Sequence, residues 1–113
     1  MTTTNTAFLA FLEQQRAEYR ALLPDRLVQI VSLWGQVLDG EAPGEALATL
    51  ERCAHSLAGS GATFGYAALG DAARQLELAI NPLLDNALAP SPETKATLGQ
   101  IVKALECCFA SAT

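Results

Sequence analysis

The sequence predicts an all-α protein: an antiparallel four-helix bundle with an additional N-terminal helix packed on it. Alanine and leucine dominate the hydrophobic half of the composition, while valine and isoleucine are sparse, which favours helix over sheet. Apolar residues recur three and four positions apart, without the alternation of strands. Proline and glycine divide the chain into five segments with short connections. Its 113 residues are near the commonest single-domain size, so one domain over residues 1–113 is expected.

Pro24 separates the first two expected helices, because proline stops a helix but suits the first turn of the next one. The first helix is expected from about Asn5 to Leu23 and the second from about Asp25 to Leu38. The apolar stripe of the first is Phe8, Leu12, Tyr19 and Leu22, with Phe11 and Leu23 beside it. The stripe of the second is Leu27, Ile30, Val31, Trp34 and Leu38, before Asp39 and Gly40 end it.

The remaining three helices would complete the four-helix core with the second. The third is expected over residues 43–64, with a bundle seam at Leu47, Leu50, Ala54, Leu57, Gly61 and Phe64. Gly65 closes it with a tight reversal. The fourth begins near Tyr66, and Pro82 predicts a kink or an early stop near Ile80. The fifth opens with Ser91 as N-cap and buries Leu98, Ile101, Val102, Leu105, Cys108 and Phe109.

Charge and composition exclude several functions. The net charge of −5 and the isoelectric point near 4.6 argue against nucleic acid as a partner, which calls for a basic patch. No basic run or long apolar stretch indicates a membrane, and the N-terminus lacks the basic region of a signal peptide. The three cysteines follow no metal-binding spacing, so reduced thiols in the cytoplasm with packing roles are expected.

The chain has a single histidine, His55, and its helical phase points it away from the core. At about 100° per residue it lies roughly 140° from the centre of the seam. Its neighbours one turn away are Glu51, Arg52, Ala58 and Gly59. Gly59 lies off the seam, so packing does not account for a glycine there, whereas Gly61 lies on it. An exposed neutral imidazole has an unperturbed pKa near about 6.5 and is a good nucleophile toward phosphorus.

The residues from His55 to Glu77 resemble a known signature. His-Ser-Leu-Ala-Gly-Ser at residues 55–60, Phe-Gly at 64–65, Leu69 and Arg-Gln-Leu-Glu at 74–77 are similar to the histidine-containing phosphotransfer (HPt) domain of bacterial multistep phosphorelays. The five-helix plan extends this resemblance over the whole chain. The resemblance implies that His55 is the phosphoacceptor, that Gly59 gives a partner access to the ring, and that Gly65 forms the helix hairpin.

The resemblance also implies the partners. His55 would accept a phosphoryl group from a receiver-domain aspartate, in a response regulator or a hybrid sensor kinase, and relay it to another receiver. The domain would be a monomeric phosphocarrier without kinase activity and without a bound cofactor or metal, with Mg²⁺ only on the receiver. The expected docking face holds small residues and one arginine: Ala48, Arg52, Ala58, Gly59 and Ala62.

One position departs from the family pattern, which has a lysine three residues after the histidine where this chain has Ala58. Arg52 on the same face, or Arg74 on the next helix, could supply the missing positive charge, or both could be ordinary surface charges. The departure supports an alternative function, an HPt-fold adaptor that docks a receiver or kinase without being phosphorylated. A metal or haem site at His55 is disfavoured, because no second ligand is expected on its face.

Overall fold

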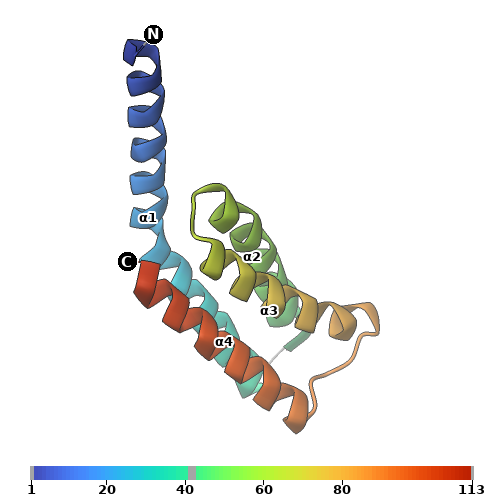
Figure 1. The fold of residues 1–113 in the computed structure, drawn as a ribbon. Helices are drawn as coiled ribbons and strands as arrows, with labels where there is room; N and C mark the ends of the chain where they lie inside the picture. Colours follow the sequence, from blue (N-terminus) through green and yellow to red (C-terminus); the bar gives the residue numbers. More distant parts are fainter. Residues whose placement is uncertain (1, 41–42, 113) are drawn as a thin grey trace.

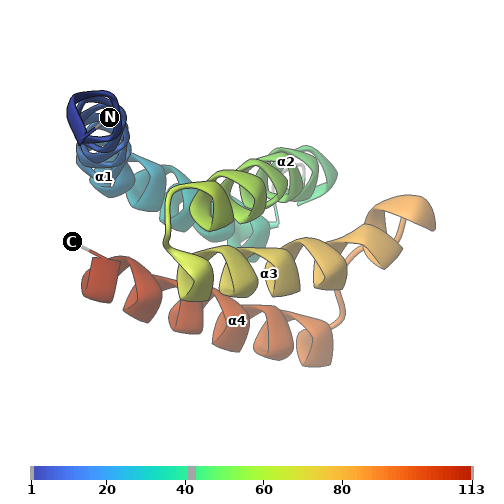
Figure 2. The ribbon, with the colours of Figure 1, turned by 45° about the horizontal axis from the view of Figure 1, so that its top comes forward.

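Four α-helices lie within residues 2–40 and 43–112, the residues that this computed structural model describes. They are α1 (Thr2–Asp39), α2 (Pro43–Thr63), α3 (Ala67–Asp85) and α4 (Pro92–Ala112). Successive helices run antiparallel, and each packs against two neighbours in the ring α1–α2–α3–α4, so they enclose one core (Figures 1 and 2). The predicted all-α bundle is confirmed. No helix of the described part is long and apolar enough to cross a membrane.

The prediction of a separate N-terminal helix was wrong, because α1 runs through Pro24 as one helix. An internal proline costs about 3 kcal/mol through the missing hydrogen bond and the steric clash. Leu23 and Ile30 are fully buried on either side of it, and each such side chain contributes about 1.5–3 kcal/mol. Their burial therefore offsets the cost of the proline. Figure 1 shows α1 changing direction along its length, as internal prolines commonly cause.

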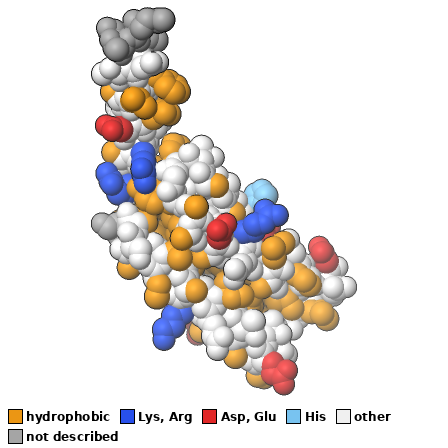
Figure 3. Space-filling view, viewed as in Figure 1, with side chains coloured by type: hydrophobic (Ala, Val, Ile, Leu, Met, Phe, Trp, Pro, Cys, Tyr) orange, Lys and Arg blue, Asp and Glu red, His pale blue; other side chains and the backbone are white. Residues whose placement is uncertain are grey.

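The sequence predicted that the N-terminal segment packs on the bundle, and this was wrong. The N-terminal half of α1 projects beyond the bundle as an arm (Figure 1). No side chain from residue 5 to residue 18 is buried. The radius of gyration is 16.3 Å, against about 13 Å for a compact domain of this length. The predicted stripe is exposed at Phe8, Phe11, Leu12 and Leu22, and Figure 3 shows apolar side chains gathered on the arm.

The second half of α1 supplies one wall of the core, with a face slightly rotated from the predicted one. Ile30 and Val37 are buried, whereas Val31 and Leu38 are exposed. Tyr19 marks where the arm meets the bundle. Its hydroxyl hydrogen-bonds to Ser60 Oγ at 2.8 Å, and its ring stacks on Phe64 at a centroid distance of 4.6 Å. Through these contacts the tip of the α2–α3 hairpin packs against α1.

The predicted seams of α2, α3 and α4 are confirmed as core. Their buried apolar side chains include Leu47, Leu50, Ala54, Leu57, Leu69, Ala73, Leu76, Ile80, Leu98, Val102, Leu105 and Phe109. Ser91 caps α4 as predicted, since its Oγ accepts a hydrogen bond from the Thr94 amide at 3.2 Å. Of the two outcomes predicted near Ile80, a kink or an early stop, the early stop is wrong, because the helix continues through Pro82 to Asp85.

Candidate functional site

The site depends on how closely α2 and α3 approach. Gly61 and Gly70 face each other across the pair, and a Cβ added to Gly61 would lie 3.1 Å from the Gly70 Cα and amide nitrogen. A Cβ on Gly70 would lie 3.0 Å from the Ala58 carbonyl oxygen. Only glycine permits backbones to come this close. The hairpin that joins the helices turns at Gly65, whose φ of +86° favours glycine, as predicted.

His55 is exposed as its helical phase predicts, with 73% of its side chain accessible to solvent. Its Nδ1 atom hydrogen-bonds to the Oε2 atom of Glu77 on α3. The Glu77 side chain is only 11% exposed. A carboxylate accepts hydrogen bonds, so this contact holds the ring proton on Nδ1 and leaves the lone pair of the neutral imidazole on Nε2.

Glu77 is a residue of the candidate site that the sequence did not single out, since it stands there only as part of the family signature. A signal was present: Gly70, Ala73 and Glu77 share one helix face by their spacing of three and four, and that face is the buried one. A charged residue on a buried face needs a partner, and His55 is the one that it has.

A shallow hollow of about 430 Å³ opens beside the imidazole, lined by Glu51, Arg52, His55 and Glu77. The structure therefore brings Arg52 to the histidine as predicted, and its Nη2 atom donates to Thr49 Oγ1 at 3.2 Å. Arg74 is exposed on α3 and does not line the hollow. The expectation that no second ligand would face His55 was wrong, since Glu51 and Glu77 offer carboxylate oxygens within 4.8 Å.

The small residues after His55 divide into two groups. A Cβ added to Gly59 would meet no atom within 4 Å, and Ala62 is exposed, so both leave open surface next to the ring. Ala58 is half-buried and packs partly against the core. Ala48, one turn before Arg52, is also half-buried.

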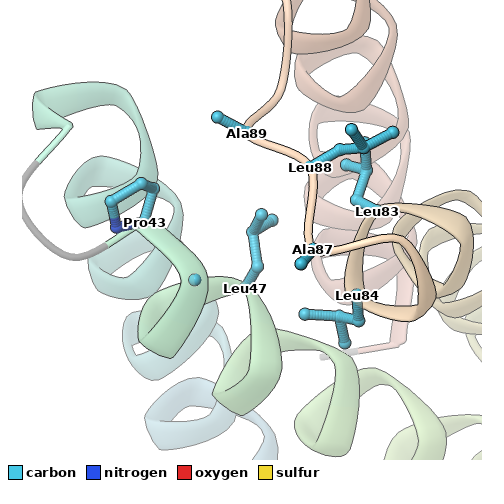
Figure 4. Close-up of a pocket in the computed structure, with 8 residues that line it drawn as sticks. Pro43, Leu47, Leu83, Leu84, Ala87, Leu88 and Ala89 are labelled. Atoms are coloured by element: carbon cyan, nitrogen blue, oxygen red, sulfur yellow. The ribbon is translucent and has the colours of Figure 1, made fainter.

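A second hollow, of about 390 Å³, lies farther along the α2–α3 pair (Figure 4). Its lining carries no ionisable side chain and consists of Pro43, Gly44, Leu47, Leu83, Leu84, Ala87, Leu88 and Ala89. Leu47 lies two turns before His55, about 12 Å along the helix. This apolar hollow therefore offers nothing to phosphoryl chemistry.

The three cysteines are free. Cys53 and Cys108 are half-buried against the core, in line with the packing role predicted for them, whereas Cys107 is exposed. Burial raises the pKa of the Cys53 thiol, and the charges of Arg26 and Arg52 oppose that rise to a smaller extent. Cys53 is therefore a weak nucleophile at neutral pH.

The fold and the site define a class of protein: an antiparallel helical bundle with an exposed histidine whose ring is hydrogen-bonded to a buried carboxylate. The family model for the Hpt domain matches residues 6–106 of the chain, and the chain belongs to this family. Hpt domains carry phosphoryl groups on histidine in phosphorelays, interact with receiver domains and are phosphocarriers, not kinases. Comparison with curated proteins and with solved structures found no match.

Proposed function

We propose that His55 is the phosphoacceptor, and that the chain accepts a phosphoryl group from the aspartyl phosphate of one receiver domain and relays it to the aspartate of another. The observation that carries this proposal is the hydrogen bond from the only imidazole of the chain to the buried carboxylate of Glu77. It leaves Nε2 as the nucleophile on a ring that is mostly exposed. Mg²⁺ would be needed only on the receiver.

The reaction can be written from these residues. The Nε2 lone pair attacks phosphorus, the P–O bond to the receiver aspartate breaks, and the aspartate leaves as a carboxylate. The imidazole gains positive charge as the N–P bond forms, and the Glu77 carboxylate at Nδ1–H stabilises that charge. Transfer to the second receiver is the reverse of these steps. Glu77 acts through His55 and touches no substrate, so it is a positioning residue.

Arg52 supports the phosphorylated state in this proposal. A phosphoryl group brings roughly two negative charges to a hollow that already holds Glu51 and Glu77. The Arg52 guanidinium is the cation among the lining residues, which makes it the replacement for the lysine absent at Ala58. Gly59 and Ala62 leave room for the receiver to reach the ring, with Ala48 at the edge of the same face.

Label transfer tests the proposal. A receiver domain phosphorylated with a labelled small-molecule donor is mixed with the wild-type chain, with His55→Gln and with Lys103→Gln, an exposed control on α4. Wild type and control should take up label, and His55→Gln should take up none while keeping its helical circular dichroism. Label on His55→Gln would overturn the assignment. Receiver binding by every variant without any label would favour the adaptor instead.

A further inference from the structure

Three side chains that can bind a metal ion, His55, Glu51 and Glu77, lie close together. One ring nitrogen of His55 and one carboxylate oxygen each from Glu51 and Glu77 lie within 4.8 Å of one another, and Nδ1 is the ring nitrogen that contacts Glu77. Glu51 and His55 are one turn apart on α2, and Glu77 reaches them from α3. We propose that these three side chains bind a Zn²⁺ ion, and that the bound ion stops His55 from accepting a phosphoryl group.

The donor set suits zinc. Zn²⁺ takes imidazole nitrogen and carboxylate oxygen at about 2.0–2.2 Å, and three protein ligands with one water are a common arrangement. Ligand atoms around a tetrahedral ion are then about 3.4 Å apart. The widest separation in the group has to close by little more than 1 Å, and the hydrogen-bonded pair of His55 Nδ1 and Glu77 has to open to admit the ion. Glu51 can make this movement, since within residues 2–40 and 43–112 no hydrogen bond or ion pair restrains its carboxylate.

The charges around the hollow favour a cation. Glu51 and Glu77 contribute two negative charges and Arg52 one positive charge, and the Arg52 guanidinium is turned toward Thr49. Glu77 is mostly shielded from water, so it gains more from a cation than an exposed carboxylate does. Mg²⁺ would not replace zinc here, because it prefers oxygen ligands and loses its water reluctantly.

The metal and the phosphoryl group compete through the ring proton. A neutral imidazole has one proton and one free lone pair. When Glu77 accepts the Nδ1 proton, the lone pair is on Nε2. When zinc takes the Nδ1 lone pair, the proton resides on Nε2 instead, no proton is lost from the ring, and Glu77 becomes a ligand. Nε2 then has no lone pair for phosphorus until the ion leaves. This consequence rests on the proposed function, whereas the binding of zinc does not.

Nitrogen-15 spectra of the imidazole test the binding directly. The chain has one histidine, so its ring signals report this site even if thiols hold further ions. Titration of the full chain with Zn²⁺ should shift Nδ1 and show a proton on Nε2. Glu51→Gln should weaken this binding tenfold or more, since even indirect partners of metal ligands contribute about 10–100-fold. Glu45→Gln, an exposed control on α2, should bind as wild type. Unchanged ring signals, or equal binding by Glu51→Gln, would overturn the site.

Label transfer in the presence of Mg²⁺ tests the inhibition. At free Zn²⁺ ten times the wild-type dissociation constant, label uptake by wild type should fall about tenfold. Uptake by Glu51→Gln at the same Zn²⁺ should fall no more than about twofold relative to its own uptake without zinc, because its site binds the ion at least tenfold more weakly. Equal inhibition of both would place the effect on the receiver and overturn the inhibitory claim. Absence of uptake without zinc would refute the proposed function instead, and the imidazole titration would still decide the metal site.

Discussion

Replacing Gly61 by alanine should loosen the α2–α3 pair on which the site is built. The new Cβ would lie 3.1 Å from the Gly70 Cα and amide nitrogen and 3.3 Å from the Tyr66 carbonyl oxygen. All three are backbone atoms, so no side chain can turn away and the helices themselves must separate. Overpacking of this kind costs about 1–3 kcal/mol, against about 1 kcal/mol gained by replacing a helical glycine with alanine.

Gly59 provides a matched control two residues earlier on the same helix. A Cβ there would meet nothing within 4 Å, so Gly59→Ala should gain the helix propensity without a clash. The propensity gain is common to both variants and cancels between them. The free energy of unfolding of Gly61→Ala should therefore be lower than that of Gly59→Ala by about 1–3 kcal/mol.

Thermal unfolding followed by circular dichroism measures this difference. At about 4 °C per kcal/mol for a domain of this size, Gly61→Ala should melt about 4–12 °C below Gly59→Ala, with the wild type between them or close to Gly61→Ala. If Gly61→Ala melted at or above Gly59→Ala, the glycine contact would not limit the separation of the helices. The same finding would remove the explanation of how Glu77 is brought to His55.

Three further outcomes follow from individual contacts. Gly59→Lys should keep or raise the melting temperature and yet slow label uptake from a receiver, because its side chain would extend over the open surface next to the ring; normal uptake would contradict the docking face. Ser91→Ala should lower the free energy of unfolding by about 1 kcal/mol through loss of the N-cap of α4, measured by urea unfolding with Ser32→Ala in α1 as the control, and an equal effect of the two would refute the capping role. In the native protein, iodoacetamide should modify Cys107 before Cys53, because Cys107 is exposed and burial raises the pKa of the Cys53 thiol; peptide mass spectrometry giving the reverse order would contradict this assignment.

The sequence predicted the helices of the bundle core well, because their seams repeat at three and four positions and their ends carry clear signals. Gly40 and Gly65 have the positive φ values expected of residues after a helix. The prediction at Pro24 was wrong because it gave a helix-breaking proline more weight than the apolar stripe that runs on both sides of it. The buried residues Tyr19, Leu23, Ile30 and Val37 continue one stripe across the proline, and that continuity indicates a single helix.

The arm could not be predicted from its own residues. Phe8, Phe11 and Leu12 have helical spacing and read as a buried face, but an amphipathic stripe shows only that a helix has an apolar side. Whether the rest of the chain reaches that side depends on the direction of α1 after its bend, which local sequence does not determine.

At the site, the angular positions of His55 and Gly59 around their helix were enough to predict that His55 is exposed and that the surface at Gly59 is open. The Glu77 contact depends on the close approach of two helices and on their register, so it needed the three-dimensional structure. The same holds for Arg52 and Arg74, which the sequence left as equal candidates for the missing charge and which the structure separates.

The nitrogen that carries phosphorus is the most direct test of the account. The chain is labelled with nitrogen-15, phosphorylated by a receiver domain, and observed through the imidazole resonances of its single histidine. The account predicts phosphorus on Nε2, with a proton on Nδ1 held by Glu77. Phosphorus on Nδ1, or an unmodified ring in a chain that has taken up phosphate, would contradict it.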